Sequence, residues 1–176
     1  MAVFRRKAVR AQLPPTVAKA LELAKGERVL AFAVDDFTGA RVVATIYALA
    51  VVAPTAELVL RRRWLSVDAG AWDPQTATLT VTWADGSRAG QWSFRDQHTW
   101  LPETVRERVQ ASVVLSTRLN LSDQRTGRVA IRQDFSTREL IAQTILGRRV
   151  SADDPEVQAH VRAALAHLRD QVGLPA

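Results

Sequence analysis

The chain has 176 residues, a length that suits one domain or one domain with an extension. It is 47% hydrophobic and 24% charged, which is typical of a protein that buries an ordinary core. It contains no cysteine, so disulfides, thiolate nucleophiles and cysteine-based metal sites are excluded. The net charge of +6 fits a nucleic-acid or anionic partner, and equally a solvated arginine-rich surface.

Residues 1–13 are expected to form a flexible basic arm, because the segment is short and has no clear periodicity. Arg5, Arg6 and Lys7 are not followed by the apolar segment that a secretory signal needs. The chain also lacks a run of about 20 apolar residues, so no transmembrane segment is expected. These features favour a cytoplasmic location.

A lead-in helix is expected over residues 14–25, with Pro15 in its first turn and Gly26 at its end. Residues 27–34 are then expected to form a strand. Residues 41–52 are apolar on both parities and rich in β-branched side chains, so they are expected to be its buried partner strand.

The segment between these strands, residues 35–39, is acidic. Asp35 and Asp36 suggest a metal or acid–base site, but Asp, Thr and Gly are also the residues that a tight turn requires. No further carboxylate or histidine stands at ligand spacing, so we interpret the segment as a turn.

Three consecutive arginines interrupt the next predicted strand, within residues 57–68. The apolar residues before and after them have opposite parity, which predicts a bulge, a sharp bend or a strand boundary. Arg61 and Arg63 should leave one face of the strand and Arg62 the other. Together with Trp64, on which an arginine could stack, they form a candidate partner-binding site. The alternative is a bent strand with a basic solvent-facing side.

All five tryptophans lie within residues 57–100. Residues 77–83 alternate apolar and polar side chains, Asp85-Gly86 is a hairpin signal, and residues 88–95 fit the return strand. One face of the strand over residues 77–83 carries Leu79, Val81 and Trp83, and this face is expected to be part of the core.

A helix is expected over residues 102–116, because apolar residues recur every fourth position. Residues 117–135 fit a further hairpin in which Arg118, Arg128 and Arg132 share a polar face. With the basic arm, this face is the candidate surface for nucleic acid or an anionic membrane, although no aromatic residues interleave with it. Residues 139–146 are ambiguous between strand and helix, and strand is favoured.

The final helix has clear boundaries. Asp154 is a capping residue, Pro155 suits the first helical position and Gly173 suits the end. His160 and His167 stand seven residues apart rather than the four of a common zinc motif, so they are interpreted as surface residues.

The order of these elements resembles the pleckstrin-homology-like (PH-like) fold, in particular its bacterial members. The matching segments are residues 26–30, the strand pair around Trp72 and Asp85-Gly86, and the helix over residues 101–113. The segment 101–109 also resembles one in uncharacterised proteins of high-GC Gram-positive bacteria.

This resemblance implies an α+β fold: an antiparallel meander sheet or partly open barrel, capped by an amphipathic helix. Residues 26–116 would be the PH-like core, and residues 117–176 a hairpin and helix packed on it in a single globular unit. The resemblance implies binding or scaffolding without catalysis. Family members that bind phosphoinositides carry a basic first hairpin loop, so the acidic residues 35–39 argue against such binding there.

The sequence leaves three functions open. The first is a non-catalytic interaction module that binds a protein partner, or a second copy, through a sheet edge or groove. The second is a nucleic-acid or anionic-surface binder that uses the arm and the arginines of residues 118–132. The third is an enzyme with a small cavity. With three histidines and no recognisable nucleotide motif, no catalytic residue, metal or cofactor is expected.

Overall fold

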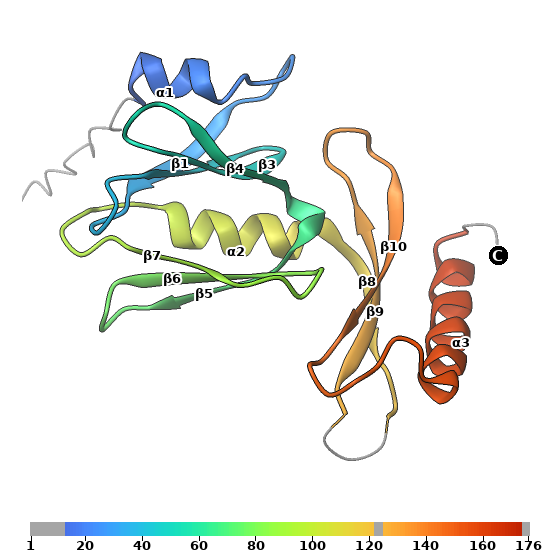
Figure 1. Cartoon of the computed structure of the whole chain (residues 1–176). Helices are drawn as coiled ribbons and strands as arrows, with labels where there is room; N and C mark the ends of the chain where they lie inside the picture. Colours follow the sequence, from blue (N-terminus) through green and yellow to red (C-terminus); the bar gives the residue numbers. More distant parts are fainter. Residues whose placement is uncertain (1–12, 122–124, 174–176) are drawn as a thin grey trace, which may run out of the picture.

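The computed structural model describes residues 13–121 and 125–173, which form an α+β structure with three antiparallel sheets and three α-helices. Within this part of the chain no sheet closes into a barrel. Figure 1 shows two lobes. The first lobe (residues 13–112) contains two sheets and the helix between them, and the second lobe (residues 113–173) contains the third sheet and the last helix.

The lead-in helix α1 (Pro15–Ala20) is shorter than expected. The prediction that it would run to residue 25 is wrong, because Glu22 adopts a left-handed backbone with φ of 44° and ends the helical path. Val17 and Leu21 are buried against the outer face of the first sheet. The helix therefore covers one face of that sheet.

The first sheet has four strands in the order β1 (Val29–Val34), β2 (Arg41–Thr45), β3 (Ala48–Val52) and β4 (Leu58–Arg63). A single strand over residues 41–52 is therefore a wrong prediction. The Thr45 hydroxyl accepts hydrogen bonds from the Tyr47 and Ala48 N–H groups and so stabilises a turn in the middle of the apolar run. Both parities are apolar because β2 and β3 pack against α1 on one face and the main core on the other.

The acidic segment between β1 and β2 is a turn, as predicted. The Asp35 carboxylate accepts hydrogen bonds from the backbone and hydroxyl of Thr38. Its other oxygen accepts the Ser93 N–H at 2.9 Å, which ties the first sheet to the second. Among the described residues no group of three or more His, Asp or Glu side chains could hold a metal ion.

The change of parity on either side of the three arginines marks a strand boundary. The 3-10 turn η1 (Trp64–Ser66) separates β4 from β5 (Val67–Asp73) and takes the chain from the first sheet to the second. The second sheet continues with β6 (Thr78–Trp83) and β7 (Gly90–Ser93). It contains the predicted hairpin at Asp85-Gly86.

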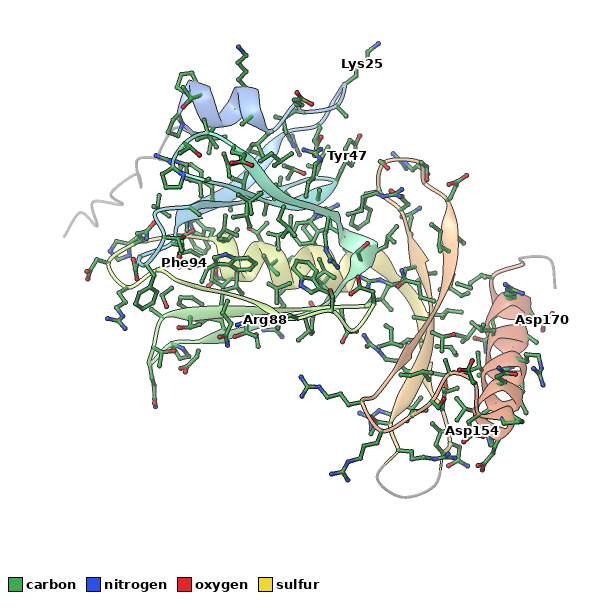
Figure 2. All side chains as sticks on the ribbon, in the orientation of Figure 1. Lys25, Tyr47, Arg88, Phe94, Asp154 and Asp170 are labelled. Atoms are coloured by element: carbon green, nitrogen blue, oxygen red, sulfur yellow. The ribbon has the colours of Figure 1, made fainter. Side chains whose placement is uncertain are left out.

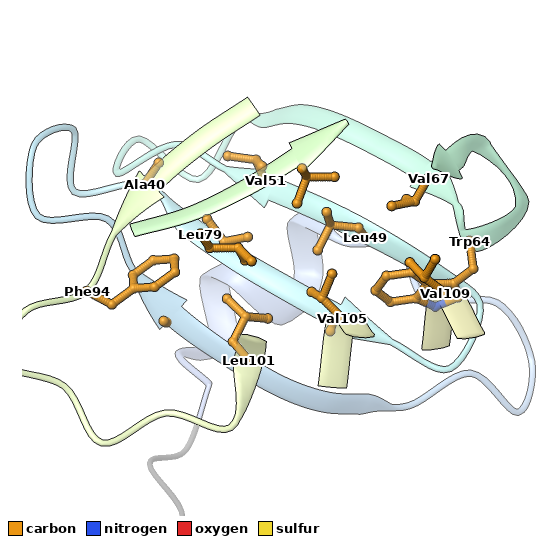
Figure 3. Packing of buried hydrophobic residues seen from close by; sticks show 14 of the residues in the cluster. Ala40, Leu49, Val51, Trp64, Val67, Leu79, Phe94, Leu101, Val105 and Val109 are labelled. Carbon is orange, nitrogen blue, oxygen red and sulfur yellow. The ribbon is translucent and has the colours of Figure 1, made fainter. Parts of the chain in front are cut away.

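The main core lies between these two sheets and α2 (Leu101–Ser112), as Figure 3 shows. The predicted burial of Leu79, Val81 and Trp83 is confirmed. A Cβ atom on Gly70 of β5 would lie 2.6 Å from Val105 Cγ1, so the close approach of α2 to this strand requires glycine.

The prediction that α2 extends to residue 116 is wrong. The helix ends at Ser112, and Val113 has extended backbone angles and begins β8 (Val113–Arg118). Consecutive β-branched residues at positions 113 and 114 favour a strand, and β8 pairs with β9 (Gly127–Gln133) on both sides of a bulge at Val114. The third sheet therefore begins earlier than the expected boundary at residue 117.

The third sheet has the order β10-β9-β8, and β10 (Leu140–Leu146) confirms the strand favoured for residues 139–146. Helix α3 (Pro155–Gln171) is capped at its N-terminus by Asp154, whose carboxylate accepts the Glu156 N–H. His167 is exposed on this helix, and His160 is partly exposed. Apolar side chains along one side of α3 pack on the third sheet and form a third core cluster with it. No helix in the described ranges is long and apolar enough to cross a membrane.

Candidate functional site

Arg61, the first of the three candidate arginines, is partly exposed and pairs with the buried carboxylate of Glu27. Its guanidinium donates to Glu27 Oε2 at 2.5 Å and to the Leu21 carbonyl at 2.7 Å. Burial opposes ionisation of Glu27, but hydrogen bonds from Thr45, the Ala24 N–H and Arg61 outweigh it and lower the pKa of Glu27 below 4.5. The pair therefore holds the end of α1 to β4.

Glu27→Gln is expected to lower the free energy of unfolding at neutral pH by about 1–3 kcal/mol, because hydrogen bonds to a charged group are lost. The stabilisation from Glu27 is complete above its unfolded pKa near 4.5 and is lost as the pH falls through the lower native pKa. Urea unfolding at several pH values should therefore show the difference from wild type shrinking in acid. Glu57→Gln, at an exposed position, is the matched control; an equal loss in both variants would contradict the assignment.

Arg62 and Arg63 point to two other carboxylates. Arg62 pairs with Asp85 at 2.8 Å and lies 4.5 Å from the centroid of the Trp83 ring. Arg63 pairs with Asp134 of the second lobe at 2.5 Å. The alternation of the three side chains follows the predicted parity, but their partners lie in three separate places, so the arginines do not converge on one pocket.

Trp64, the fourth residue of the candidate site, is only 1% exposed. Its indole N–H donates to the Thr45 carbonyl at 2.9 Å, and its ring packs in the main core beside Val109 (Figure 3). A partner therefore cannot reach Trp64 without opening the core. The exposed tryptophans of the described residues are Trp100, at 73%, and Trp72, at 38%.

The candidate anionic-partner face is also divided by the structure. The expectation that Arg132 lies on an accessible polar face is wrong, because the side chain is 1% exposed at the joint between the lobes. Burial, with the nearby charge of Arg128, lowers the pKa of Arg132 to about 10. Arg128 pairs with Asp68, and Arg118 is exposed. Arg5, Arg6 and Lys7 lie outside the described residues.

The buried Arg132 donates hydrogen bonds to the Val67 carbonyl at 2.7 Å, to the Trp64 carbonyl at 2.9 Å and to the Ser112 hydroxyl. Gln143 adds a hydrogen bond from its side-chain amide to the Leu65 carbonyl. The joint between the lobes is thus made largely of polar groups that meet the 3-10 turn and the end of α2.

The edges of the three sheets are a second kind of place where a partner could bind. The three sheets have six edge strands, and four of these carry an extra residue that interrupts the pairing register. Such bulges hinder the addition of another strand. The extra residues are Leu30 in β1, Val59 in β4, Asp68 in β5 and Val114 in β8. The fifth edge strand, β7, has only four residues.

The sixth edge strand, β10, has none of these protective features. Its seven residues pair with β9 in unbroken register, from Leu140 opposite Gln133 to Leu146 opposite Gly127. The strand contains no charged residue and no proline. Because charges, prolines and bulges are the usual protection of exposed edges, β10 is the long regular edge left open in the described part of the chain.

The hydrogen bonds at both ends of the β9–β10 hairpin show which backbone groups face outward. Asp134 N–H donates to the Glu139 carbonyl, and Gly147 N–H donates to the Thr126 carbonyl. In an antiparallel pair such hydrogen-bonded positions alternate. The odd-numbered residues of β10 therefore bond to β9. The even-numbered residues direct their N–H and C=O groups to the open edge; these are Leu140, Ala142, Thr144 and Leu146.

Cavities lie on both sides of this edge, and Thr144 lines both. One cavity, of about 250 Å³, lies between the lobes and is lined also by Ser66, Ala84, Asp85 and Gln143. The other, of about 260 Å³, lies between β10 and α3. Space is therefore present on each side of the open backbone.

Comparison of the chain with models of known protein families, with curated proteins and with solved structures found no match.

Sequence reasoning favoured a strand at residues 139–146 but did not single out its edge as a site. One local signal was available: residues 140–146 are uncharged, with Glu139 before them and Arg148 after Gly147. The unpaired edge depends on which strands become neighbours, and that arrangement has no signature within the segment itself.

Proposed function

We propose that this chain is a non-catalytic interaction module that binds an extended segment of a partner protein along the open edge of β10. The observation that carries this proposal is the contrast among the six edges, of which four are bulged and one is short, whereas β10 is long, regular and uncharged. In strand addition the main-chain hydrogen bonds supply affinity, and side-chain pockets beside the edge supply specificity.

We also propose that the first lobe is a bacterial PH-like scaffold. Support comes from its order of elements, in which a four-stranded meander is followed by a three-stranded meander and then by α2. In this proposal the second lobe is an addition that carries the binding edge. The scaffold would position β10, and the joint around Arg132 would fix the orientation of the two lobes.

The proposal is tested by removing one outward N–H group. The immobilised full chain is used to select binders from a phage-displayed library of random linear peptides, and the affinities of synthetic copies are measured by fluorescence anisotropy. Thr144→Pro should weaken binding about tenfold or more, because an unpaired partner group costs about 1–3 kcal/mol.

Thr144→Ala is the matched control, since it truncates the side chain and keeps the N–H. It should bind the peptides about tenfold or more tightly than Thr144→Pro does, because it keeps the outward N–H group. Circular dichroism should show both variants folded, because the Thr144 N–H is not part of the ladder with β9. Equal affinity of folded Thr144→Pro and wild type would contradict binding at this edge.

A further inference from the structure

We infer that the groove between β10 and α3 selects a segment with a large apolar side chain and an acidic side chain two residues away. This inference rests on the proposed function and specifies its ligand. Helix α3 packs mainly over β9 and β8, so β10 extends past the helix and a groove remains between them. Figure 2 shows the side chains that fill the rest of the space between α3 and the third sheet.

The groove contains an apolar cavity of about 260 Å³. Leu146 of β10 and Val157 and Val161 of α3 contribute apolar side chains to its lining, and Ala152 lies in the loop before the helix. A water molecule takes up roughly 30 Å³ of liquid, so the cavity has room for a side chain the size of Leu, Met or Phe. Its lining also includes Thr144, Gln158 and Arg162.

The direction of the β10 side chains connects this cavity to the open backbone. Thr144 and Leu146 line the cavity, and both belong to the even-numbered set whose N–H and C=O groups point outward. A residue of an added strand that lies opposite Thr144 directs its side chain to the same face of the sheet. That side chain therefore enters the cavity between β10 and α3.

The charge near the cavity favours an acidic neighbour. Arg162 lines the cavity and is exposed on α3, and no ion pair of this arginine is found within the described ranges. Side chains two residues apart in a strand share a face, so an acidic residue at that spacing from the apolar one can meet Arg162.

The same charges argue for a partner protein over a second copy of this chain. Two copies would each bring a net charge of +6, and β10 itself offers no acidic residue to Arg162. An acidic extended segment of another protein satisfies both the local arginine and the overall charge.

The test uses the peptides selected from the random phage-displayed library by the wild-type chain. Their sequences should be enriched in a large apolar residue with Asp or Glu two positions away. Replacing that acid with Lys in the synthetic peptide should weaken binding about tenfold. Arg162→Glu should reverse this order and favour the Lys peptide, whereas Arg106→Glu, an equal charge change at an exposed position of α2, should leave it unchanged.

A second variant tests the cavity. Ala152 is exposed, so Ala152→Phe can fill the cavity without disturbing the core, and it should remove the preference for a large apolar residue. If both Ala152→Phe and Arg162→Glu keep the wild-type preferences while Thr144→Pro loses binding, the inference about the groove is wrong and the edge remains the site. If Thr144→Pro binds normally, or the library yields no binder, the proposed function itself is wrong.

Discussion

Trp64→Ala is expected to destabilise the first lobe by about 3–5 kcal/mol, the range observed when a large buried aromatic side chain is truncated. Trp64 is among the largest fully buried side chains of the structure, and its ring packs with the core residues between the two sheets. The substitution also leaves the Thr45 carbonyl without the indole N–H that it accepts. Urea unfolding followed by circular dichroism measures the loss.

Trp100→Ala provides the control, because the side chain is 73% exposed at the start of α2. Its stability should change by no more than about 0.5 kcal/mol, as for most surface substitutions. This pair of variants separates a core tryptophan from an exposed one. Wild-type stability of Trp64→Ala would contradict the structural role assigned here.

The arginine cluster illustrates how far the sequence alone could be interpreted. Local periodicity correctly placed Arg62 on the opposite face from Arg61 and Arg63, because strand side chains alternate. The carboxylate partners lie 34, 23 and 71 residues away from Arg61, Arg62 and Arg63 respectively. Pairings at such separations depend on the folded arrangement, so the sequence suggested an open anion site where the structure has three ion pairs.

The errors in element boundaries also have a physical cause. The turn between β2 and β3 contains neither glycine nor proline, the usual sequence signals of a turn. It is stabilised instead by the Thr45 hydroxyl, which accepts hydrogen bonds from two backbone N–H groups. The end of α2 has no glycine either. Its apolar spacing continues to Val113, where pairing with β9 replaces helical hydrogen bonding. In both cases tertiary contacts decide between alternatives that are locally similar.

The candidate binding edge was only partly predictable. Residues 140–146 could be assigned to a strand, because the segment is short, apolar and bounded by Gly147. Four of the other edges are protected by bulges, each formed by one extra residue in the edge strand. An extra residue can be recognised only when it is known which strand pairs with which, and in what register.

Arg132→Met is expected to lower stability by about 3 kcal/mol and to uncouple the two lobes. The substitution leaves the Val67 and Trp64 carbonyls and the Ser112 hydroxyl without their donor, at about 1–3 kcal/mol for each buried group. Removal of the cost of burying the guanidinium offsets part of this loss. Because the first lobe and the second lobe have separate core clusters, their unfolding should no longer coincide.

Calorimetry and urea unfolding should therefore show two transitions for Arg132→Met and one transition for the wild type. Arg118→Met is the matched control, because Arg118 lies on the neighbouring strand of the same sheet and is exposed. It should retain a single transition at the wild-type midpoint. A single unshifted transition in Arg132→Met would contradict a joint held by this arginine. A second, weaker transition would instead support the view that one buried cation fixes how the binding edge is presented relative to the first lobe.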